Sequence, residues 1–120
     1  MLFILFALFV CTDTGFTQTQ RSEAETWNLA SFIIKEIETG KASFMTMASL
    51  YSEDIGSASK GGDLGWLSRG TLIPEYESLA WTLPIGTVSQ PFKTSYGIMI
   101  LQVVDRNTEK VWTRFILLKL

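Results

Sequence analysis

Apolar residues recur at helical spacing in the first half of the chain, and this spacing predicts two helices. The first helix carries its apolar residues on one face: Trp27, Ala30, Ile33, Ile34 and Ile37. Ser22 and Glu25 have the spacing of a capping box, which predicts where this helix begins, and Gly40 is a natural stop. A second helix is predicted over residues 42–51, where one face is again apolar.

Turn-forming residues and short apolar runs predict strands in the second half of the chain. Residues 52–65 are rich in Ser, Gly and Asp, which is typical of a loop with at most one helical turn. Pro74 fits the first position of a third helix, whose inner face holds Tyr76. Strands are predicted at 64–68, 88–94, 98–104 and 111–119. The combination predicts an α+β fold.

The apolar start of the chain, MLFILFALFVC, has two interpretations. It is too short to span a bilayer as a helix, so it is either the apolar part of a signal segment or a buried strand. No Lys or Arg precedes it and no small-residue cleavage site follows it, which weakens the signal interpretation. Cys11 follows the bulky Val10, so a lipid-anchored cysteine is also poorly matched.

Composition narrows the function classes. The chain has 120 residues, of which 47% are apolar and 18% charged, enough for one hydrophobic core. The net charge is −2 and the Lys and Arg residues are scattered, which disfavours nucleic-acid binding. With no histidine, catalysis by histidine and metal sites with histidine ligands are excluded. Nothing in the sequence implies a metal or another cofactor.

The segment YSEDIGSASKGGDLGWLSRGTLIPEYESLAWTLPIGTVSQPFKTSYGIMILQVVDR, residues 51–106, contains an ordered series of motifs. GGDLGW, PEYE and the final TSYGIMILQV follow one another at the spacing of the parvulin-type peptidyl-prolyl isomerases, and the segment resembles that family. The resemblance covers residues 20–106 most firmly. Its nearest likeness is to the bacterial envelope parvulins that act as foldases or chaperones.

The resemblance implies a β-α-α-α-β-α-β-β domain with helices around a small antiparallel sheet. We assign residues 1–110 to this domain, with 1–19 alternatively a signal segment. Residues 111–120 are an extra strand, and RFILLKL within it is similar to the strand that opens a further parvulin domain. Residues 2–10 would supply the first strand, with Phe3 or Phe6 at a family histidine. If 2–10 are a signal, 111–119 is predicted to pair with 98–104 as a hairpin.

The resemblance also implies a site. The substrate-binding residues would be Leu64, Leu72, Tyr76 and Tyr96, of which the first three form the proline pocket. The catalytic group would comprise Asp54, Thr94 and Met99. Asp54 falls where the family has Asp or Cys facing the substrate carbonyl, and Met99 stands in place of the second family histidine. Without the motif, the aliphatic residues would be ordinary core and Asp54 would cap a turn.

Two functions follow from these assignments. The first is a peptidyl-prolyl cis-trans isomerase that assists the folding of unfolded or exported polypeptides, weakened by the loss of the histidines. The alternative is a chaperone module that keeps the parvulin fold and binds peptides without catalysis. Either would take proline-containing unfolded peptides as partners and neither would use nucleic acid or metal. The family likeness places the chain in the periplasm or bacterial cell envelope.

Overall fold

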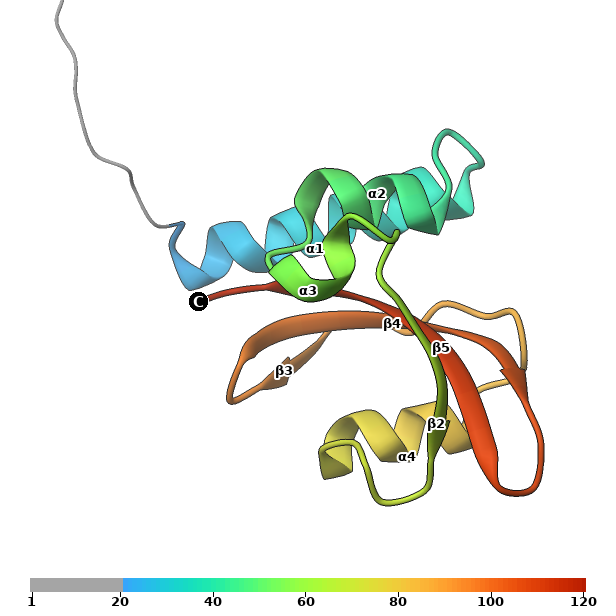
Figure 1. Cartoon of the computed structure of the whole chain (residues 1–120). Coiled ribbons are helices and arrows are strands. Elements are labelled where there is room, and N and C mark those ends of the chain that lie inside the picture. Colours follow the sequence, from blue (N-terminus) through green and yellow to red (C-terminus); the bar gives the residue numbers. More distant parts are fainter. Residues whose placement is uncertain (1–20) are drawn as a thin grey trace, which may run out of the picture.

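The computed structural model describes residues 21–120 of the chain. Within them, four strands form one antiparallel sheet in the order β2-β5-β4-β3. The strands are β2 (Asp63–Ser68), β3 (Phe92–Thr94), β4 (Gly97–Arg106) and β5 (Lys110–Leu118). The helices α1 (Glu23–Glu38), α2 (Phe44–Tyr51) and α3 (Ile55–Ala58) lie on one side of the sheet, and α4 (Pro74–Thr82) lies on the other (Figure 1). The predicted α+β class is confirmed.

Helix α1 begins as its sequence predicts. The Glu25 backbone N–H donates to the Ser22 hydroxyl at 3.1 Å, and the Ser22 N–H donates back to the Glu25 carboxylate at 2.8 Å. This capping box satisfies two N–H groups that a helix leaves unpaired at its start. Thr26 is fully buried although it is polar, because its hydroxyl donates to the Ser22 carbonyl at 2.9 Å.

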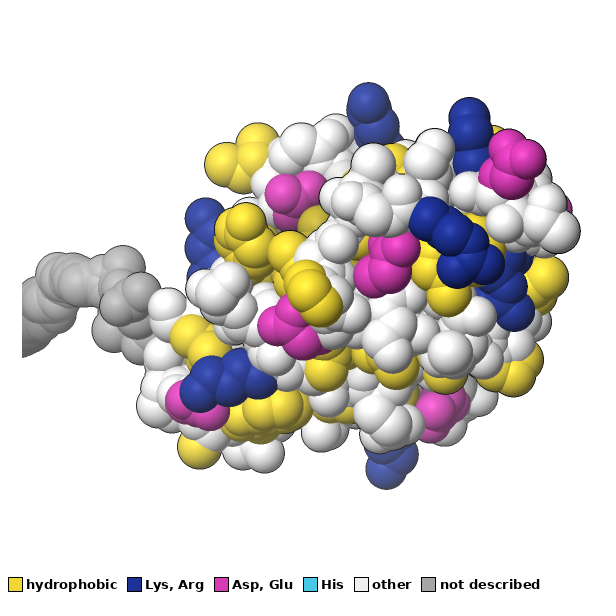
Figure 2. All heavy atoms as spheres, turned by 90° about the horizontal axis from the view of Figure 1, so that it is seen from below, with side chains coloured by type: hydrophobic (Ala, Val, Ile, Leu, Met, Phe, Trp, Pro, Cys, Tyr) yellow, Lys and Arg dark blue, Asp and Glu magenta, His cyan; other side chains and the backbone are white. Residues whose placement is uncertain are grey.

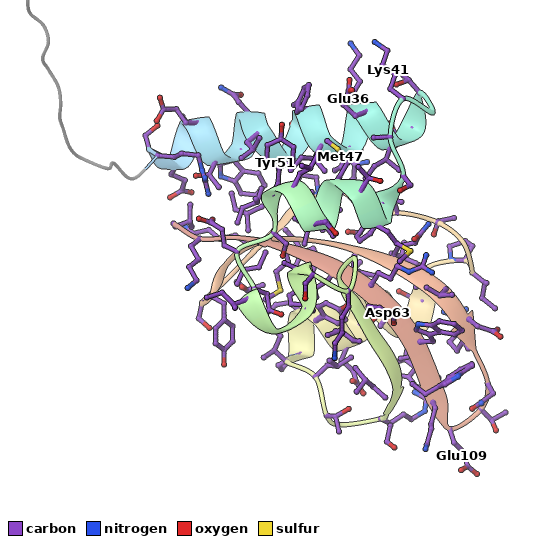
Figure 3. All side chains as sticks on the ribbon, turned by 45° about the horizontal axis from the view of Figure 1, so that its top comes forward. Glu36, Lys41, Met47, Tyr51, Asp63 and Glu109 are labelled. Atoms are coloured by element: carbon purple, nitrogen blue, oxygen red, sulfur yellow. The ribbon has the colours of Figure 1, made fainter. Side chains whose placement is uncertain are left out.

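The core has two layers because successive residues of β4 point to opposite faces of the sheet. Ile98 and Ile100 pack with α1 and α2, in a cluster that includes Met47 and Tyr51 of α2 (Figure 3). Met99 and Leu101 pack on the other face, in the cluster that includes residues of α4. Both layers depend on β4 and β5, which are the two inner strands of the sheet.

Strand β5 forms a hairpin with β4, in a register that runs from Ile98 opposite Leu118 to Arg106 opposite Val111. This is the hairpin predicted for 98–104 and 111–119 if residues 2–10 are a signal segment, and the signal interpretation itself stays a prediction. Gly62 allows β5 to approach closely: its φ is +79°, and a side chain there would meet the Phe115 carbonyl. The alternative first strand at 2–10 lies outside the described residues, as do Phe3, Phe6 and Cys11.

The predicted strand at 88–94 is wrong in its first half, because only Phe92–Thr94 forms a regular strand. Val88 makes an isolated bridge to Gln102, and the Ser89 hydroxyl accepts from the Leu101 N–H at 3.0 Å. Pro91 then interrupts the ladder because proline has no N–H to donate. The segment therefore follows the edge of β4 without becoming a continuous strand.

Candidate functional site

A cavity of about 210 Å³ opens at one end of the sheet. Its lining comprises Asp54, Tyr96, Met99, Phe115 and Leu117. These residues come from the start of α3, the turn between β3 and β4, and the two inner strands. The walls are therefore mostly apolar, with one carboxylate and one phenol. Such a lining suits a small apolar group held beside a few polar contacts.

A second hollow, of about 390 Å³, lies on the surface of α2 and the turn before β2. It is lined by Met45, Thr46, Ser49, Leu50, Ser59, Lys60 and Gly61. None of the site residues predicted from the sequence lines it. The smaller cavity is the better candidate because three separate parts of the predicted motif meet there: Asp54, Tyr96 and Met99.

Asp54 is held in place by its own contact with α3 and by the bonds that join the two preceding residues to β5. It is the N-cap residue of α3, and its carboxylate accepts a hydrogen bond from the Ser57 hydroxyl. The preceding residue is fixed to β5, because the Glu53 N–H donates to the Leu117 carbonyl at 2.7 Å. The Leu117 N–H in turn donates to the Ser52 hydroxyl at 3.1 Å. Strand β5 therefore sets the position of the segment that carries the carboxylate.

Thr94 lies beside the cavity and does not line it. Its hydroxyl donates to the Gly97 carbonyl at 2.8 Å and accepts from the Tyr96 N–H at 3.1 Å. Both bonds stay within the turn, and the Tyr96 side chain is left 61% exposed at the cavity. In this arrangement Thr94 fixes the turn that carries Tyr96, and its assignment to the catalytic group stays a prediction.

Tyr76 lies in the apolar cluster beneath the cavity. Its ring packs edge-on against Phe115 and Phe92, with ring centroids 5.9 and 6.3 Å apart. Its hydroxyl shares a 2.7 Å hydrogen bond with the Thr113 hydroxyl. Burial raises the pKa of the Tyr76 hydroxyl, despite that hydrogen bond, so the phenol stays protonated. The hydroxyl is therefore part of the core and is not presented to a ligand.

Leu64 and Leu72 are half-buried and pack against the same cluster as Tyr76. The structure thus brings the three predicted pocket residues together, on the side of the sheet that carries Met99. They adjoin the residues that line the cavity without lining it themselves. Their assignment as a proline pocket stays a prediction.

Phe115 and Leu117 line the cavity, but the sequence argument did not include them in the site. Both belong to β5, whose contribution depends on the hairpin that returns it beside β4. A signal was present in the sequence, because RFILLKL is similar to a parvulin opening strand, but we expected that segment to open a further domain. Met99, which the resemblance places at the second family histidine, therefore lines the same cavity as Phe115. Phe3 and Phe6, the two candidates for the first histidine position, lie outside the described residues.

The fold and the cavity define a small α+β domain with an apolar site at the end of its sheet. The sequence pattern of the rotamase family, a PPIC-type PPIase domain, matches residues 4–105. The chain therefore belongs to the PPIC-type peptidyl-prolyl isomerase family, the parvulins. Strand β5, which supplies two of the cavity residues, lies beyond the matched segment.

Curated relatives carry chaperone and foldase names. The chain is 45% identical over 86 residues to Chaperone SurA of Pseudomonas syringae pv. tomato, covering 72% of this chain and 20% of that protein. It is 48% identical over 67 residues to Foldase protein PrsA of Geobacillus kaustophilus, covering 56% and 24%. The chain therefore spans about a fifth of the length of these relatives.

Proposed function

We propose that this domain binds proline-containing segments of unfolded polypeptides and catalyses rotation about the X–Pro bond, at a rate reduced by its apolar Met99 and Phe115. The observation that carries the proposal is the cavity in which Asp54 and Tyr96 adjoin these two side chains. Membership of the isomerase family supports the reaction type. The alternative, a module that binds peptides without catalysis, becomes one outcome of the test below.

The reaction needs no nucleophile. Rotation about the peptide bond faces a barrier of about 20 kcal/mol because twisting removes amide resonance. A cavity lowers that barrier when it holds the proline ring and favours the twisted amide over the planar one. Met99, Phe115 and Leu117 would exclude water from the ring, and Asp54 would stand near the amide. No histidine is present to tune the carboxylate, which is why we expect a reduced rate.

The role in the whole protein follows from the relatives. Proteins named as a chaperone and a foldase contain segments similar to this chain, which supports a part in protein folding. We extend this to unfolded or exported polypeptides as clients and to the periplasm or cell envelope as the compartment, on the family likeness. Among residues 21–120, no helix is long and apolar enough to cross a membrane.

The test is cis/trans exchange of a short Ala-Pro peptide, measured by NMR with and without the protein. We expect faster exchange, and we expect Tyr96→Ala to weaken peptide binding about five- to tenfold because an exposed aromatic contact at the cavity is lost. Ile85→Ala is the matched control, since Ile85 is 52% exposed and does not line the cavity.

The outcomes separate the two functions. Faster exchange that falls in Tyr96→Ala and persists in Ile85→Ala supports isomerisation at this cavity. Chemical-shift changes on peptide binding without any acceleration would replace the proposal by the non-catalytic module. Equal effects of both variants would place the site elsewhere on the domain.

A further inference from the structure

Asp54 is a carboxylate that has no cationic partner within the described residues, and it lies in a mostly apolar cavity. Among residues 21–120, its one hydrogen-bond donor from a side chain is the Ser57 hydroxyl, and an ionised carboxylate has about four acceptor positions. Among residues 21–120, no Lys or Arg forms a salt bridge with Asp54. Residues 1–20 contain neither Lys nor Arg, so that segment has no such side chain to supply.

The neighbouring Glu53 shows the contrast. Its carboxylate lies 2.6 Å from the Arg21 guanidinium and accepts from the Lys119 backbone N–H at 2.7 Å. The charge of Glu53 is therefore compensated, and within the described part of the chain the carboxylate of Asp54 is left without a cation. A peptide that fills the cavity removes water from Asp54, and dehydrating an unpaired charge is unfavourable. A ligand that carries its own cation avoids that cost.

Tyr96 offers a second contact for the same cation. Its ring lines the cavity with Asp54 and is 61% exposed. A tyrosine ring attracts Lys or Arg placed over its face, and this attraction adds to that of a carboxylate nearby.

Seen from the α4 side, the Lys and Arg side chains lie at separate places on the surface rather than as one continuous patch (Figure 2).

We propose that Asp54 and Tyr96 make this site select peptides with Lys or Arg immediately before the proline. The inference rests on the proposed function, because the bond that rotates joins the proline to that residue. The preceding side chain therefore enters the site next to the proline ring. A Glu or a phosphorylated residue at the same position would face Asp54 and be rejected by like charge.

The test compares peptides that are identical except for Lys, Met or Glu before the proline. Lys and Met both have unbranched side chains, so their ratio isolates the charge. We expect the Lys-Pro peptide to bind about three- to tenfold more tightly than the Met-Pro peptide, and the Glu-Pro peptide to bind most weakly. Raising the salt concentration should reduce the Lys/Met ratio.

Asp54→Asn tests the residue without changing its size. The Asp54 side chain makes no capping hydrogen bond to the backbone of α3, so α3 should still form in this variant. The Lys/Met ratio should fall toward one in this variant. Glu109→Gln is the control: it removes one negative charge at the tip of the β4–β5 hairpin (Figure 3), and the ratio should be kept.

The results distinguish two failures. If Lys-Pro and Met-Pro peptides bind equally to the unaltered protein, the selectivity is refuted while the binding function stands. If the Lys/Met ratio survives Asp54→Asn, Asp54 does not determine it. If none of the three peptides binds, the proposed function fails and this inference fails with it.

Discussion

Tyr76 and Tyr96 carry the same side chain in opposite settings, and the difference predicts their effects on stability. The Tyr76 hydroxyl is bonded to Thr113, whose side chain is fully buried, whereas Tyr96 is mostly exposed. Tyr76→Phe leaves the Thr113 hydroxyl without that partner, so the free energy of unfolding should fall by about 1–2 kcal/mol. Urea denaturation measures this change.

Tyr96→Phe is the matched control, since it deletes the same atom at an exposed position. Its free energy of unfolding should change by less than about 0.5 kcal/mol. Equal stability of Tyr76→Phe and the unaltered protein would mean that the bond between Tyr76 and Thr113 contributes nothing net. The comparison also guides the choice of site variants, because truncating Tyr76 disturbs the core while truncating Tyr96 does not.

Strand β5 passes close to Gly62, whose left-handed backbone conformation residues with a side chain rarely adopt. Gly62 has φ +79°, and an added Cβ would meet the Phe115 carbonyl and the Ala48 side chain. Gly62→Ala should therefore destabilise the domain by at least about 2 kcal/mol, from the left-handed backbone and the steric contact together. Thermal unfolding followed by circular dichroism is the measurement.

Gly56→Ala provides the control for that substitution. Gly56 lies in α3, its φ is not in the left-handed range, and an added Cβ would meet nothing within 4 Å. This variant should be neutral or slightly stabilising, because alanine is favoured over glycine in helices. A similar loss of stability in both variants would contradict the view that Gly62 acts through its contact with β5.

Local patterns predicted most elements, and non-local pairing explains what they missed. The capping box of α1 and Pro74 at the start of α4 are set by neighbouring residues, so the sequence alone indicated both. The family motif likewise assigned Asp54, Tyr96 and Met99 to one site, and all three line the same cavity. The irregular path of residues 88–91 was missed because the prediction did not allow for Pro91, which has no N–H to donate to a neighbouring strand. Phe115 was missed because its place depends on the partner strand.

The inner position of β5 is the feature of the whole molecule that depends most on contacts between residues far apart in the sequence. It pairs with β2 on one side and β4 on the other, and it contributes to both core clusters. It also supplies Phe115 and Leu117 to the cavity, although the family match ends at residue 105. The folding unit should therefore extend through β5. That RFILLKL opens a further domain stays a prediction.

A pair of truncated chains tests this extent. A chain of residues 1–106 lacks β5 and should lose its cooperative urea transition, because both core clusters would be left open. A chain of residues 21–120 should keep the transition and its peptide binding. Adding a synthetic peptide of residues 107–120 to the shorter chain should restore dispersed NMR signals. If residues 1–106 fold without that peptide, the missing inner strand comes from residues 2–10, and β5 is replaceable.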